Sequence, residues 1–259
     1  MIHPESEQIF YENLRNNRKD VIKSLAELNI KNYTIREDLT VDVHERVVIK
    51  DDYFLELPVK FGIIKGDFIC WRIGLDNLKG CPQKVMGKFI VTGNRLTSFK
   101  YAPQIVGEDF FCNSNELTSL ECAPKIINKN FHCQNNKLTS LEGGPMEIVG
   151  DFDCSFNKIT SLDHAPQKVY GNFDCSYNHI ETFPYENLFI KGKLKCCHKN
   201  EISGLESFYE KIGFLYFYED FYGENLLNIQ YKYLTSYFLS MKLENNLTKK
   251  DIIKATNKI

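Results

Sequence analysis

The sequence of 259 residues has no long apolar run, no dense cluster of charges of one sign and no recognisable secretory signal at its start. No apolar run approaches the ~20 residues that cross a bilayer, and the start MIHPESEQIF lacks the basic and apolar regions of a signal peptide. The formal net charge is only -2, and no Lys and Arg stretch is dense enough to follow a phosphate backbone. We therefore expect a cytoplasmic protein with neither a membrane nor a nucleic-acid partner.

Disulfides are not expected either, although the chain contains nine cysteines. Most of these cysteines recur at one position of an internal repeat, where they would stack as small buried hydrophobic side chains ~4.8 Å apart. We interpret them as reduced, structural thiols.

The internal repeat has a constant period, which phenylalanine marks most clearly. The phenylalanines are Phe68, Phe89, Phe110, Phe131, Phe152 and Phe173, with Leu194 next in the series. Cysteine, asparagine, leucine, proline and valine keep the same spacing, so the repeat reads F-x-C-x-x-N-x-L-T-S-L-x-x-A-P-x-x-V. The step from one phenylalanine to the next, about 21 residues, lies within the range of roughly 20 to 29 residues that is typical of a leucine-rich repeat solenoid.

Three regions follow from this periodicity. Residues 1–44 are predicted to form an N-terminal cap of helix and hairpin, in which Leu39, Val41 and Val43 pair with the strand at Val47 and Ile49. Residues 45–205 form the repeats, and Val47 already lies one period before Phe68. Residues 206–259 form an aromatic-rich helical C-terminal segment, because solenoid ends need covering.

Within each repeat, alternation predicts a short parallel strand whose Phe and Cys point inward. The asparagine that follows turns the chain, and its buried amide can bond unpaired backbone groups of its own coil and of the neighbouring coil. Proline suits an extended return path with little helix. We expect Asn136→Ala to leave such backbone groups unsatisfied.

The repeats resemble bacterial and bacteriophage leucine-rich repeats, whose core N-x-L-T-S-L occurs here at Asn115 to Leu120, Asn136 to Leu141 and Asn157 to Leu162. The resemblance implies a leucine-rich repeat solenoid, rich in parallel β-strands with little convex helix, between helical N- and C-terminal caps. Secreted bacterial ubiquitin ligases are similar, but they carry a large catalytic domain that the short stretch after Leu205 does not match.

Function in such a solenoid normally lies on the exposed side of the strands. We predict an apolar zone near the N-terminal end and an acidic, aromatic zone further along. The candidate partner-binding residues are Ile69, Trp71, Ile90, Phe111, His132, Asp151, Asp153, Phe156, Asp174 and Tyr177. Two structural alternatives stay open: the N-terminal cap covers the first zone, and the second is an ordinary solvated surface.

Catalytic, metal and cofactor sites are not predicted. Asp109, Asp151, Asp153 and Asp174 fall on neighbouring coils, but no nucleophile, phosphate-binding loop or ligand spacing accompanies them. Adjacent Cys196 and Cys197 would face opposite sides of a strand, which disfavours zinc.

The sequence therefore predicts a non-enzymatic protein-binding module. The phage resemblance implies a phage-encoded protein that binds and inhibits a host defence factor in the host cytoplasm. The alternative is a structural or self-assembling component, a homo-oligomer formed through the C-terminal segment.

Overall fold

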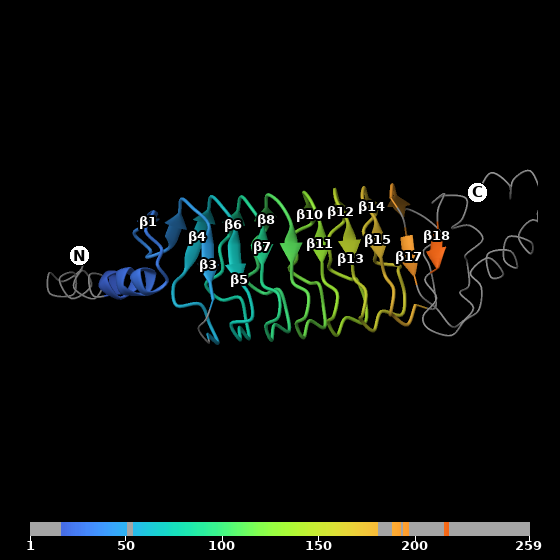
Figure 1. Cartoon of the computed structure of the whole chain (residues 1–259), viewed down its shortest axis with the longest axis horizontal. Helices are drawn as coiled ribbons and strands as arrows, with labels where there is room; N and C mark the ends of the chain where they lie inside the picture. The colour runs from blue at the N-terminus through green and yellow to red at the C-terminus, as the bar shows by residue number, and fades with distance from the viewer. Residues whose placement is uncertain (1–16, 51–53, 181–187, 193, 197–214, 218–259) are drawn as a thin grey trace, which may run out of the picture.

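The computed structural model describes residues 17–50, 54–180, 188–192, 194–196 and 215–217. These residues form an elongated solenoid of parallel strands with very little helix, in which the coils follow one another along the long axis (Figure 1). Strands that pair within the repeats lie one sequence period apart, as Phe68 does from Phe89, so the sequence period is one turn of the solenoid.

One side of the solenoid is a nine-stranded sheet, which we call the front sheet. Phenylalanine lies opposite phenylalanine across most of it, for example Phe131 opposite Phe110 and Phe152. Its strands are β3 (Val47–Ile49), β5 (Phe68–Cys70), β7 (Phe89–Ile90), β9 (Phe110–Phe111), β11 (Phe131–His132), β13 (Phe152–Asp153), β15 (Phe173–Asp174), β17 (Leu194–Cys196) and β18 (Leu215–Phe217).

The return path also forms hydrogen-bonded strands, which the sequence analysis had described only as extended. We call the two resulting sheets the return sheets. The first contains β1 (Tyr33–Ile35), β2 (Val41–Val43), β4 (Phe61–Ile64), β6 (Lys84–Val85) and β8 (Ile105–Val106). The second contains β10 (Ile126–Ile127), β12 (Glu147–Ile148), β14 (Lys168–Val169) and β16 (Phe189–Ile190). Between β8 and β10, the Asn128 side-chain amide donates to the Val106 carbonyl at 3.1 Å.

The structure describes residues 17–44 of the predicted N-terminal cap, whose role as a cap stays a prediction. Residues 17–27 are helical, but the hairpin is β1 with β2, which pair antiparallel, and not β2 with β3. β3 instead lies in the front sheet, parallel to β5, with Val47 opposite Phe68. The predicted hairpin was wrong because Val47 and Ile49 have to join the inward Phe and Cys columns, which lie on the other side of the coil. Their interpretation as a first, degenerate repeat is confirmed.

At the other end, β18 continues the front sheet, with Leu215 opposite Leu194. The periodic spacing therefore extends beyond Leu205, where we expected it to stop. The rest of the predicted helical segment, including Phe208 and Tyr231, lies outside the described residues, so its helices and the domain boundary stay predictions.

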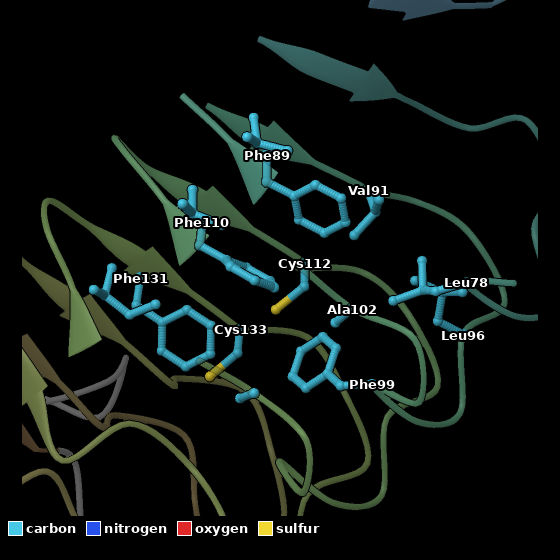
Figure 2. Packing of buried hydrophobic residues seen from close by; sticks show 14 of the residues in the cluster. Leu78, Phe89, Val91, Leu96, Phe99, Ala102, Phe110, Cys112, Phe131 and Cys133 are labelled. Carbon is cyan, nitrogen blue, oxygen red and sulfur yellow. The ribbon is translucent and has the colours of Figure 1, made fainter. Parts of the chain in front are cut away.

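The core is a stack of identical layers. Rings of neighbouring phenylalanines from Phe68 to Phe173 have centroids 4.8 to 5.8 Å apart, and every one of them is buried. Figure 2 shows three of them, Phe89, Phe110 and Phe131, on successive coils. The cysteine column lies beside them, reduced and buried, and this burial raises the pKa of the Cys70, Cys112 and Cys133 thiols well above the ordinary value. These thiols are therefore protonated packing groups and not nucleophiles.

The predicted asparagine ladder is present. The Asn136 amide donates to the Cys112 carbonyl at 3.2 Å and to the Cys133 carbonyl at 3.0 Å, and its oxygen accepts from the Leu117 N–H at 3.0 Å. Equivalent bonds are made by Asn94, Asn115, Asn157 and Asn178. Each asparagine thus joins two coils through backbone groups that no strand satisfies.

Asn136→Ala should lower the free energy of unfolding by ~1 to 3 kcal/mol, because buried carbonyls and an N–H lose their partner. Urea unfolding followed by circular dichroism measures this loss. Thr118→Ala, at an exposed position of the preceding coil, is the matched control and should change the free energy by less than ~0.5 kcal/mol. Equal effects of the two changes would contradict the proposed role of the amide.

Candidate protein-binding face

The predicted site residues lie mainly on the outer side of the front sheet, which we call the front face. In β5 the order is buried Phe68, half-buried Ile69 and buried Cys70, which is the alternation that the sequence predicted. The corresponding half-buried residues are Ile90, Phe111, His132, Asp153 and Asp174. The register places these side chains in one row, with neighbours on adjacent coils.

In the N-terminal zone Trp71 is exposed, whereas Ile69, Ile90 and Phe111 are half-buried. Trp71 leaves 53% of its surface accessible, so the described part of the N-terminal cap does not cover it. The Arg72 guanidinium carbon lies 5.2 Å from the centroid of the indole ring, within the range of a cation–π contact. The alternative that the cap covers this zone also involves residues 1–16, which lie outside the described residues, so it stays open.

Two aromatic pairs lie further along the front face. Phe111 and His132 stack with centroids 4.6 Å apart and planes 5° from parallel. Phe156 and Tyr177 stack with centroids 4.1 Å apart and planes 11° from parallel. Each pair joins two adjacent coils, so the rings are held in position before any partner binds.

Phe156 and Tyr177 belong to a column with left-handed backbone conformation. Their φ angles are 53° and 54°, and the column also contains Arg72, Ser114 and Asn135 at similar values and Gly93 at 73°. Residues other than glycine are destabilised by ~1 kcal/mol or more in this backbone conformation. The repeated fold imposes the turn at this position. In two coils the residue at the turn is aromatic, and these two rings, Phe156 and Tyr177, stack on one another.

The carboxylates of the acidic zone are bound to the fold. Oδ1 of Asp153 accepts hydrogen bonds from the N–H of Ser155 at 2.9 Å and from its hydroxyl at 2.6 Å. Oδ1 of Asp174 accepts the same two hydrogen bonds from Ser176. Oδ2 of Asp174 lies 3.0 Å from the Lys195 ammonium. By contrast, Oδ2 of Asp153 makes no hydrogen bond within the described part of the chain.

Asp151 and Asp109 occupy the position before the inward phenylalanine, where their carboxylates accept hydrogen bonds from the backbone of the next coil. Oδ1 of Asp151 accepts from the Asn172 N–H at 2.6 Å, and Oδ1 of Asp109 accepts from the Asn130 N–H at 3.2 Å. Burial alone would raise the pKa of Asp109, but this bond and the Lys88 ammonium hold it below the ordinary value. We had assigned Asp151 only to partner binding and missed this second ladder of side chains.

The pKa of His132 lies below its ordinary value because the ring is desolvated in its stack, although the charges of Asp153, Asp109 and Asp151 act in the opposite direction. The ring is therefore mostly neutral near pH 7. It can contribute an apolar surface to an interface without an unpaired charge.

Sequence reasoning missed the outer side of the return sheets, which we call the return face. It carries exposed apolar side chains along most of its length: Ile63, Met86, Ile105, Ile126, Met146, Val149, Tyr170 and Phe189. The signal was available, because period-two alternation around the buried valine of A-P-x-x-V predicts that the residue before the valine points outward.

Phe111→Ala should return the pKa of His132 towards its ordinary value, because it opens the ring to water. The His132 pKa is lowered on folding, so its contribution to stability is complete above the unfolded pKa of about 6.5 and declines as the pH falls through the folded value. Phe111→Ala should weaken that acid dependence. Proton NMR titration of the imidazole measures the pKa, and an unchanged value would contradict the stack as its cause.

No group of three or more His, Cys, Asp or Glu side chains within the described ranges is arranged to hold a metal ion. The same ranges contain no helix that is long and apolar enough to span a bilayer. No protein-family model matches the chain, and comparisons with curated proteins and with solved structures found no significant match. The parallel-strand solenoid is established from the register of its own coils.

Proposed function

We propose that the protein is a non-enzymatic binding module that presents its front face to another protein. The observation that carries this proposal is the set of accessible aromatic rings, Trp71 and the two stacked pairs, on a hydrogen-bonded sheet. Aromatic side chains are the usual anchors of protein interfaces. Rings that are already ordered lose little conformational entropy on binding, which favours affinity.

The partner should offer an apolar surface with a cation near its centre. Asp153 lies opposite His132 in the register, on the same coil as Phe156, and has one carboxylate oxygen without a hydrogen bond in the described structure. Asp174, by contrast, is already paired with Lys195. A partner Arg or Lys between the stacks would bind Asp153 and contact the face of Phe156. The half-buried Ile69 and Ile90 extend the apolar contact towards Trp71.

The biological role that we propose follows from the resemblance to bacteriophage leucine-rich repeats. On that basis the protein is phage-encoded, acts in the host cytoplasm and inhibits a host defence factor by occupying its surface. This step rests on the repeat motif N-x-L-T-S-L alone and is an argument by analogy. The alternative role, self-assembly through residues 206–259, concerns a segment of which only β18 is described, so no observation favours it.

Affinity capture from bacterial lysate tests the front face. The full chain should retain a host protein, and the triple change Trp71→Ala, Phe111→Ala and Tyr177→Ala should weaken binding of that protein by at least about tenfold, because interface aromatics commonly contribute more than ~1 kcal/mol each. Titration calorimetry with the purified partner measures the loss.

A control variant changes an exposed aromatic residue elsewhere. Tyr101→Ala alters a side chain that is exposed and lies outside the front sheet, and it should leave the affinity for the partner unchanged. Asp153→Asn should weaken binding and reduce its dependence on salt. Retained affinity in the triple variant, with an unchanged melting temperature, would refute the assignment of the front face.

A further inference from the structure

The return face has an arrangement of charged and apolar residues that the proposed binding module does not use. Ile105 and Ile126 lie at its middle, on β8 and β10, with 50% and 57% of their surfaces exposed. Exposed aliphatic side chains in contiguous rows on a sheet are typical of an interaction surface. The row of outward residues, one from each coil, is Ile63, Lys84, Ile105, Ile126, Glu147, Lys168 and Phe189.

We propose that the return face binds a second copy of this chain, with the two solenoids packed face to face and running in opposite directions. The twofold axis lies parallel to the strands and passes between β8 and β10, where the two return sheets are separate. This operation keeps each side chain at its level along the strand and reverses the order of the coils. It places Ile105 of one copy against Ile126 of the other, twice.

Charge complementarity selects this register. One coil further out, the same axis places Lys84 opposite Glu147 of the other copy, and by symmetry Glu147 opposite Lys84. Lys84 has no ion pair among the described residues, while Glu147 has only a distant one, with its Oε2 atom 3.9 Å from the Lys168 ammonium. Both side chains therefore have capacity for an intermolecular partner.

The next row of the return face agrees with the same register. Met86 and Val149 follow the buried residues Val85 and Ile148 and are each 46% exposed. The proposed axis places Met86 of one copy against Val149 of the other. The interface then has an apolar centre of isoleucine, with a Lys–Glu pair and a Met–Val contact on each side.

Other face-to-face registers are less favourable. Moving the axis onto β10 places Lys84 opposite Lys168 of the other copy, and a like-charge contact costs affinity. Solenoids running in the same direction bring each coil against its own copy, so Lys84 meets Lys84 and Glu147 meets Glu147. Of these arrangements, only the axis between β8 and β10 joins apolar to apolar and acid to base over the four central coils, and one coil further out it places Ile63 opposite Lys168 of the other copy. The charge and apolar pattern of this face is therefore complementary to the same face of a second copy.

Charge reversal in the full chain tests the proposal. Sedimentation velocity from low micromolar to about 1 mM protein should show a monomer–dimer equilibrium. Lys84→Glu should raise the dimer dissociation constant at least tenfold, Glu147→Lys should do the same, and the double variant should restore it, because only the reversed pair recreates both contacts. Ile126→Glu should abolish the dimer, and circular dichroism checks that each variant is folded.

Lys168→Ala and Lys84→Ala form the matched control, since both lysines lie in one row but only Lys84 faces a carboxylate of the second copy. Lys84→Ala should weaken the dimer several-fold more than Lys168→Ala does. A chain that stays monomeric at every concentration would overturn the proposal. So would a dimer that Ile126→Glu leaves intact, or one that is lost only on deletion of residues 206–259.

Discussion

The register between successive coils is the constraint on which the rest of the structure depends. It requires each coil to place the same kind of side chain at the same point, because that side chain packs against its own equivalent one coil away. Phe110 fits only because Phe89 and Phe131 leave a ring-sized layer on either side of it. Coils that were longer or shorter by one residue would reverse the inward and outward faces of a strand and expose the phenylalanine.

The same register that packs the core also leaves backbone polar groups without hydrogen-bond partners. The bends between strands leave backbone groups without ladder partners, and a buried unsatisfied group costs ~1 to 3 kcal/mol. Two kinds of short polar side chain solve this at different corners of the coil. Asn157 bonds carbonyls of two coils, and Asp151 accepts from the N–H of Asn172 on the next coil. Polar residues in both columns therefore stabilise the fold, and only polar residues outside these two columns are available solely for binding a partner.

The sequence predicted whatever the period determines directly. The inward Phe, Cys and Leu columns, the parallel strands and the asparagine ladder all follow from side-chain alternation and the spacing of the repeat. It did not predict which strand β2 would pair with, because local alternation around Val41 and Val47 is equally consistent with a hairpin or with two sheets. It also did not reveal that Asp153 and Asp174 accept hydrogen bonds from Ser155 and Ser176, because an outward Asp can either bond its own backbone in this way or stay free for a partner.

In-register stacking also governs the surface, because identical charges would repel one another along every column. At several positions charge alternates between coils, as in Lys88 with Asp109, Glu108 with Lys129 and Glu116 with Lys137, whose charged atoms lie 2.7 to 3.1 Å apart. Asp153 and Asp174, which lie opposite one another in the register, are an exception. The exposed pairs, Glu108 with Lys129 and Glu116 with Lys137, each contribute little to stability, at most about 1 kcal/mol. They offset like-charge contacts within their own columns. Where charges are paired in this way, the accessible aromatic and aliphatic side chains, together with the carboxylate of Asp153, distinguish one face from another, so recognition depends on where those side chains are placed.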